Sequence, residues 1–147
     1  MRLLLPLQLL TTLAMFGLIW FVEIVHYPLF LHVGAQEFPA YEAAHANRTT
    51  YVVAPLMLVE LATALLLLLP RLRPSVISAS GAWIGASLLA VIWLSTALLQ
   101  VPLHNRLQAG YSAELIRNLI ATNWIRTAAW TARAILVLRW AYDVKSV

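Results

Sequence analysis

The residues best suited to chemistry are concentrated between Glu23 and Glu60, which hold three of the four histidines and four of the six acidic residues. Within this stretch, Glu23-x-x-His26 and Glu42-x-x-His45 each place a carboxylate and an imidazole on one face of a helix. Paired Glu-x-x-His motifs ligate two irons in some four-helix proteins. These spacings therefore raise the hypothesis of a metal centre.

A complete di-iron site is not expected. It would also take one glutamate from each of two other helices, and the third and fourth apolar segments contain no acid. We therefore expect a mononuclear or dinuclear site. Imidazole with carboxylate suits zinc, copper, iron or nickel, and iron, copper and zinc are the expected metals. The predicted ligands of the site are His26, His45, Glu60 and His104. In the alternative interpretation, the histidines satisfy helix ends and hydrogen-bond their neighbours without a metal.

The elements that position these residues are expected to lie in a membrane. Of the 147 residues, 62% are hydrophobic and only 11% are charged, whereas soluble domains carry about 25% charged residues. We predict one integral membrane domain over residues 1–147, with the lipid bilayer as its surroundings. The Lys and Arg residues are scattered, so nucleic acid is not an expected partner. Because the chain has no cysteine, disulfides and thiolate chemistry are excluded.

Four apolar segments reach the length of about 20 residues that a helix needs to cross a bilayer. They span about residues 4–25, 51–69, 76–100 and 122–142, and Pro102 is expected to end the third. We predict an all-α integral membrane four-helix bundle. Residues 36–50 should form a helix that runs into the second span, and Ser112 should cap a short amphipathic helix before the fourth. Both of these helices are placed on the exterior side, and no internal repeat is evident.

The basic residues indicate the orientation of the bundle. One side has Arg2, Arg71, Arg73, Arg139 and Lys145, and the other has only Arg48, Arg106 and Arg117. Because basic residues favour the cytoplasmic side, we predict that both termini and the 70–75 turn are cytoplasmic. In a bacterial inner membrane the other two connections would then face the periplasm. All four histidines lie at that outer end.

Two charges fall inside the apolar segments. At about 1.5 Å of rise per residue, Glu60 and Arg133 each lie about 14 Å from the outer ends of their spans. A charge at that depth costs about 2.5–3.5 kcal/mol and normally faces a partner inside the bundle. The equal depths predict a structural ion pair between Glu60 and Arg133. That pair competes with the use of Glu60 as a metal ligand.

The fourth segment presents a polar and aromatic stripe. Asn123, Arg126, Trp130, Arg133 and Trp140 recur at helical spacing on one face. An inward stripe with two arginines can bind an anionic or carbonyl-bearing ligand, with Arg126 near the mouth as the predicted contact. The predicted substrate-binding residues are Asn105, Asn123, Trp124, Arg126 and Trp130. Trp124 also suits the aromatic belt at a membrane interface.

Several short motifs resemble a known group of proteins. These motifs are His26-Tyr27-Pro28, Phe38-x-x-Tyr41-x-x-x-His45, Pro102-Leu103-His104-Asn105-Arg106-Leu107 and Asn123-Trp124-x-Arg126-Thr127. They are similar to motifs of small bacterial four-helix membrane proteins of unknown function, which in turn resemble the anthrone oxygenase-like family. In that family a Pro-x-x-Asn-x-x-Leu element follows the third helix. The resemblance implies a four-helix fold and an oxygenase that acts on a quinone- or polyphenol-like substrate.

Three functions remain open at this stage. The first is an oxidoreductase, metal-dependent or cofactor-free, with His26, Tyr41, His104 and Arg126 as catalytic residues. Histidines would ligate a metal or act as bases, and Arg126 would hold an oxyanion on a flat apolar substrate. The second is a protein that binds or transports a metal, a lipid or a small hydrophobic ligand, for which Pro55 within a span is a hint. The third is an accessory subunit of a membrane complex; a homo-oligomer is a further expectation.

Overall fold

The computed structural model describes residues 3–145, which form an all-helical fold without strands. The all-α prediction is confirmed for these residues. Arg2, one of the residues in the charge count, lies outside the described part, and so does the side chain of Lys145.

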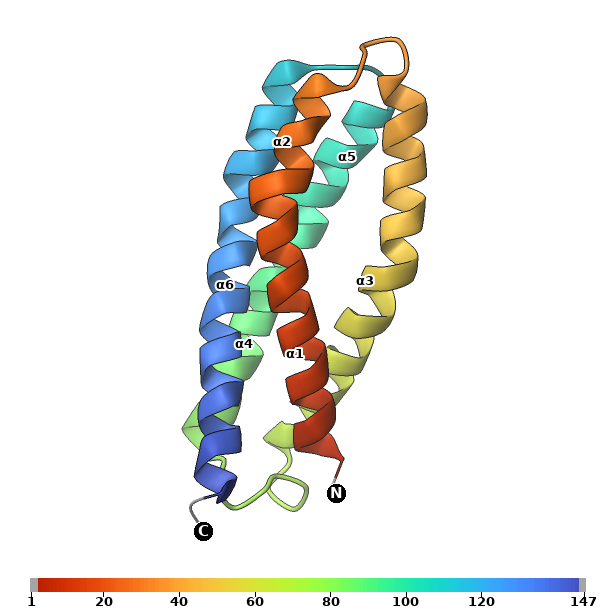
Figure 1. The fold of residues 1–147 in the computed structure, drawn as a ribbon. Coiled ribbons are helices and arrows are strands. Elements are labelled where there is room, and N and C mark those ends of the chain that lie inside the picture. Colours follow the sequence, from red (N-terminus) through yellow and green to blue (C-terminus); the bar gives the residue numbers. More distant parts are fainter. Residues whose placement is uncertain (1–2, 146–147) are drawn as a thin grey trace.

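Four long helical rods lie side by side and run alternately up and down (Figure 1). The first rod joins α1 (Leu4–Phe21), the π-helical η1 (Val22–His26), α2 (Tyr27–Leu29) and the 3-10 turn η2 (Phe30–His32). The second is α3 (Phe38–Leu68), and the fourth is α6 (Ala113–Lys145). The third joins α4 (Ala79–Ser95), the π-helical η3 (Thr96–Gln100) and α5 (Val101–Gln108). The start of α1 and the end of α6 lie at one end of the bundle, opposite the end that holds α2 and α5 (Figure 1).

Three of the rods can cross a membrane by length and composition. They are Leu4–His32, Phe38–Leu68 and Ala79–Gln108, with mean hydropathies of 1.8, 2.2 and 1.9 over their most apolar windows. Each has 29 to 31 residues. At about 1.5 Å per residue this length exceeds the roughly 30 Å of a bilayer core. The rods therefore extend beyond the hydrocarbon, and the more polar α6 packs along α1 and α4.

At the histidine end the helices extend beyond the predicted membrane spans. The helix over 36–50 does run into the second span, as predicted, since α3 begins at Phe38. The amphipathic segment near Ser112 is the first part of α6 rather than a separate helix. Ser112 does cap it, because its Oγ accepts the backbone N–H of Leu115 at 3.3 Å. The predicted end of the third helix at Pro102 is wrong, since the helix continues to Gln108.

The π-helical segments explain how the rods continue through their prolines. A proline removes a backbone N–H donor and crowds the preceding turn of an α-helix. In η3, the N–H of Val101 bonds to the carbonyl of Thr96, and in η1 the N–H of Tyr27 bonds to that of Val22. These wider i to i+5 turns come just before Pro102 and Pro28 and open the helix there.

The two halves of the chain repeat one order of elements. Each half has a helix, a five-residue π segment, a Pro-containing helix, a turn and a long return helix. The sequence did not reveal this repeat. Apolar residues substitute freely for one another on membrane helices, so little beyond Pro28-Leu29 and Pro102-Leu103 matches in letters.

Candidate functional site

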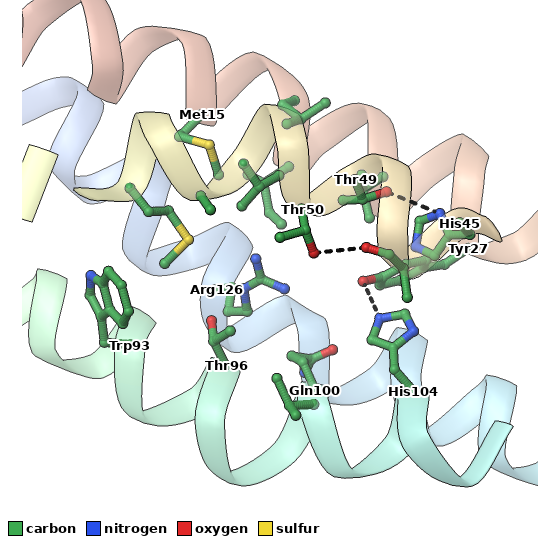
Figure 2. A pocket seen from close by; sticks show the side chains of 18 of the residues that line it. Met15, Tyr27, His45, Thr49, Thr50, Trp93, Thr96, Gln100, His104 and Arg126 are labelled. Carbon is green, nitrogen blue, oxygen red and sulfur yellow. Dashed lines mark hydrogen bonds between the residues drawn. The ribbon is translucent and has the colours of Figure 1, made fainter. Parts of the chain in front are cut away.

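A cavity of about 390 Å³ lies among the four rods in the histidine half of the bundle. Figure 2 shows Met15 and Trp93 at one end of it, His45 and His104 at the other, and Arg126 between. The first end is apolar, and the second gathers ring nitrogens and hydroxyls. The volume falls in the range of about 300–1,000 Å³ that is typical of small-molecule sites.

A line of three side chains forms the polar end. Glu42 on α3 is fully buried, and one oxygen of its carboxylate contacts Nδ1 of His104 on α5. The other ring nitrogen of His104, Nε2, lies 3.0 Å from the hydroxyl of Tyr27. With the ring proton on Nδ1, His104 donates to Glu42 and accepts the Tyr27 hydroxyl proton through Nε2. A carboxylate that orients an imidazole, which in turn accepts from a hydroxyl, is an arrangement suited to proton transfer.

His26 and His45 form a second pair beside this line. Nε2 of His26 lies 2.9 Å from Nδ1 of His45, and the Thr49 hydroxyl lies 3.2 Å from the same nitrogen. The His45 ring is 5.4 Å, centre to centre, from that of His104. His45 and His104 line the cavity, whereas His26 lies behind His45 and does not. The two rings thus hold each other, with one donor and one acceptor.

Arg126 is held by a buried polar chain. Asn123 donates through Nδ2 to Oε2 of Glu23 at 2.7 Å, and Arg126 donates through a terminal nitrogen to Oδ1 of Asn123 at 3.3 Å. All three residues are at most 7% exposed. Arg126 lines the cavity, and its Nε has no hydrogen-bond partner. The guanidinium is therefore a fixed cation beside the cavity with donor capacity left over.

Glu60 and Arg133 lie deeper in the bundle and contact each other. Nε of Arg133 donates to Oε1 of Glu60 at 2.8 Å, and both side chains are at most 1% exposed. Thr12 and Gln8 also donate to Glu60, and Arg133 contacts the carbonyl of Gly85. The structure thus joins the two charges that were expected at equal depth. The spacing of Gln8 and Thr12, one helical turn apart in an apolar helix, was a signal that sequence reasoning missed.

Three of the four predicted metal ligands, His26, His45 and His104, lie next to one another, but Glu60 does not join them. Glu60 accepts hydrogen bonds from Arg133, Thr12 and Gln8 rather than from a histidine. His26 and His45 face each other instead of a common point. Across the described residues, no group of three or more His, Asp or Glu is placed to hold a metal ion. The described residues therefore do not form the predicted four-ligand group, and metal binding stays a prediction.

In both Glu-x-x-His motifs the glutamate contacts a residue on another helix rather than the histidine three positions later. Glu42 contacts His104 and not His45, because both side chains of the pair face the neighbouring helices. Glu23 accepts from Asn123. Glu23 and His26 lie in the π segment, whose wider turn no longer places residues three apart on one face.

Of the remaining predicted site residues, Asn105 lines the cavity, whereas Tyr41, Asn123, Trp124 and Trp130 do not. Tyr41 is 37% exposed and packs on Phe30 and Phe38, one position along α3 from the inward face of Glu42. Trp124 is exposed against Trp20, and Trp130 is fully enclosed in the apolar core. Asn105 lines the mouth, whereas Asn123 acts one layer back through Arg126. Sequence reasoning gave no role in the site to Tyr27, Gln100 or Trp93, which line the cavity.

Comparison with protein-family models, curated proteins and solved structures gives no match. The resemblance to the anthrone oxygenase-like proteins therefore stays a prediction.

Proposed function

We propose that the protein binds a small, flat hydrophobic molecule with a phenol, quinone or other carbonyl oxygen, and acts on it as a membrane-embedded oxidoreductase. One observation carries this proposal: the apolar cavity ends at the Glu42–His104–Tyr27 line with Arg126 beside it. Ligand sites of this kind combine an apolar lining with a few fixed polar groups that orient the ligand.

The chemistry that these residues can supply is proton transfer with stabilisation of an oxyanion. A ligand proton passes to the Tyr27 oxygen while Tyr27 gives its own proton to Nε2 of His104, and Glu42 stabilises the resulting imidazolium. Arg126 stabilises the negative oxygen left on the ligand. An oxidation also needs an electron acceptor. The resemblance to oxygenases makes dioxygen our proposed acceptor.

We propose the form of this enzyme that has no resident iron, copper or zinc, because the predicted ligands are engaged by one another and by Arg133. A second candidate is a binding or transport protein without turnover. Its support is the repeat of one element order in two halves that run in the same direction. Parallel repeats of this kind build several transporters.

The site would face the periplasm from a bacterial inner membrane. In this proposal α6 crosses the bilayer as the fourth span, and both termini are cytoplasmic. Its support is that Arg126 and Arg133 are buried inside the bundle rather than exposed to lipid. Intramembrane arginines normally face the interior in this way.

Binding can be measured through Trp93, which lines the apolar end of the cavity. Titration of detergent-solubilised protein with 2-methyl-1,4-naphthoquinone should quench fluorescence that Trp93→Phe lacks. Arg126→Leu should weaken this binding about tenfold, since a hydrogen bond to a charged group contributes about 1.5–3 kcal/mol. Quenching of the same size in Trp93→Phe and in the wild type would show that the quinone binds elsewhere, and would contradict the cavity as the ligand site.

Turnover can be followed as dioxygen uptake with anthrone as the probe. His104→Gln and Glu42→Gln should lower the rate by about 10²-fold or more, the usual contribution of a positioned base. The control is His32→Gln, because His32 is an exposed histidine outside the cavity. Equal rates in His104→Gln and His32→Gln would refute the base assignment. Quinone binding without uptake in the wild type would favour the binding or transport function.

A further inference from the structure

The exposed part of the cavity lining lies on α3 and α5. The lining residues on the first rod and on α6 are buried or half-buried. The exposed members of the lining are Thr50 on α3 and Val101, Asn105 and Gln108 on α5. Along α3 the wall of this mouth also carries Ala46 and Ala54, one helical turn on either side of Thr50. Small side chains at this spacing leave the gap between α3 and α5 open.

The exposed surface of α3 and of the third rod changes from apolar to polar along the bundle axis. Toward the middle of the bundle its exposed side chains are apolar, with Val52 55%, Leu94 58% and Leu98 68% exposed. Toward the histidine end they are polar, with Asn47 and Arg48 on α3 and Arg106 on α5. In a protein whose rods cross a bilayer, such a change marks the boundary between hydrocarbon and headgroups.

The inside of the cavity has the same polarity gradient. Met15, Met57 and Trp93 lie toward the middle of the bundle, and Tyr27, His45 and His104 lie toward the headgroup side. An amphiphile resting in the adjacent leaflet has this orientation already, with its polar ring outward and its tail inward. It can therefore move sideways into the cavity without turning over and without leaving an apolar environment.

We infer that the ligand is a single-tailed, ring-headed amphiphile that reaches the cavity from the neighbouring leaflet through the mouth between α3 and α5. This inference rests on the proposed function, since it concerns the same cavity. The ring seats at the histidine end within reach of Tyr27 and Arg126, and the tail lies along Met57 and Trp93 or leaves through the mouth. A cavity of about 390 Å³ is too small for both chains of a phospholipid, so the bilayer's own lipids are excluded as its full occupants.

The absence of cysteine from the chain permits a direct test. Thr50→Cys places a thiol in the mouth, and Val52→Cys places a control thiol on an exposed part of α3 outside the cavity lining. Each variant is folded, reconstituted into phosphatidylcholine vesicles and then modified with a bulky maleimide. Decylubiquinone is added and the quenching of tryptophan fluorescence is recorded. The quenching measured in Trp93→Phe is subtracted, so that only the Trp93-dependent part remains. Because modification follows folding, a loss of signal cannot come from misfolding during synthesis.

The expected result is loss of Trp93-dependent quenching in modified Thr50→Cys, with normal quenching in unmodified Thr50→Cys and in modified Val52→Cys. Decylubiquinone added first should slow modification of Thr50→Cys. Normal quenching in modified Thr50→Cys would overturn entry through the mouth between α3 and α5, while the cavity would remain a binding site. Equal quenching by a membrane-impermeant naphthoquinone sulfonate would overturn the bilayer as the source. No Trp93-dependent quenching in any form would instead overturn the proposed function, and the inference with it.

Discussion

Each of the three buried carboxylates in the first half of the chain is held by a residue of the second half. Glu23 accepts from Asn123, Glu42 contacts His104, and Glu60 pairs with Arg133. Burial of an ion costs several kcal/mol, which only a close partner with further hydrogen bonds can offset. These three contacts therefore fix how the helices can be arranged. Two of them also position the groups beside the cavity.

The pair of Glu60 and Arg133 should behave as a unit in unfolding experiments. Removal of one partner leaves the other charge buried and unpaired, so Glu60→Met and Arg133→Met should each lower the free energy of unfolding by about 3–5 kcal/mol. The double variant should lose less than either single variant, because no unpaired charge remains. Denaturation in mixed micelles with increasing dodecyl sulfate measures these differences. Arg139→Met, at an exposed position of α6, is the control; additive losses would contradict the coupling.

At this scale the sequence predicted the burial of Glu60 and Arg133 better than it predicted the partners of the other buried carboxylates. Glu60 and Arg133 could be matched because depth in a helix follows from residue number. The partner of Glu42 could not be found, since a three-residue spacing reports a shared helix face and says nothing of the helix opposite. Tyr41 was predicted in the site and Tyr27 was not, because the π-helical segment that precedes Tyr27 leaves no mark in composition.

At the scale of elements, the π-helical segments η1 and η3 flank the cavity on two of its walls. Val22 from η1 and Thr96 and Gln100 from η3 all line it. Segments of this type are rare and occur often at functional sites. Here each one allows a rod to pass a proline and still present Tyr27 or His104 to the same space. The sequence predicted the apolar lengths of the rods, whereas the continuation past Pro102 depended on hydrogen bonds that periodicity does not report.

The contact of α4 with α6 depends on glycines. A Cβ added at Gly85 would lie 3.2 Å from the Trp140 ring and 3.5 Å from a terminal nitrogen of Arg133. Gly85→Leu should therefore push the two helices apart and lower the free energy of unfolding by about 1–3 kcal/mol, the usual cost of overpacking. Gly17→Leu is the matched control, because a Cβ there meets nothing within 4 Å. Both are measured by dodecyl sulfate denaturation. Equal stability of the two variants would contradict close packing at Gly85.

For the whole molecule, the bundle shape makes a definite prediction of topology. If α6 crosses the bilayer with the other three rods, Arg139 lies on the side of the 69–78 connection, and Ala35 and Ala109 lie on the other. Single cysteines at Ala35 and Ala109 should react with a membrane-impermeant maleimide in intact bacterial cells, and cysteines at Ser75 and Arg139 should react only after lysis. The reverse pattern would refute the proposed orientation. Labelling of Arg139→Cys together with Ala35→Cys would refute the fourth crossing.

The distribution of buried charge between the halves also has a consequence for synthesis. Among the residues that the structure describes, the buried carboxylates all belong to the first helical pair, and the buried arginines all belong to the last rod. During translation the first pair therefore reaches the membrane while Asn123, Arg126 and Arg133 have yet to be made. Each unpaired charge at the bilayer centre costs about 2.5–3.5 kcal/mol on insertion scales. The first two helical rods are therefore unstable in lipid before α6 is made. We expect them to stay beside the insertion machinery until α6 has been synthesised.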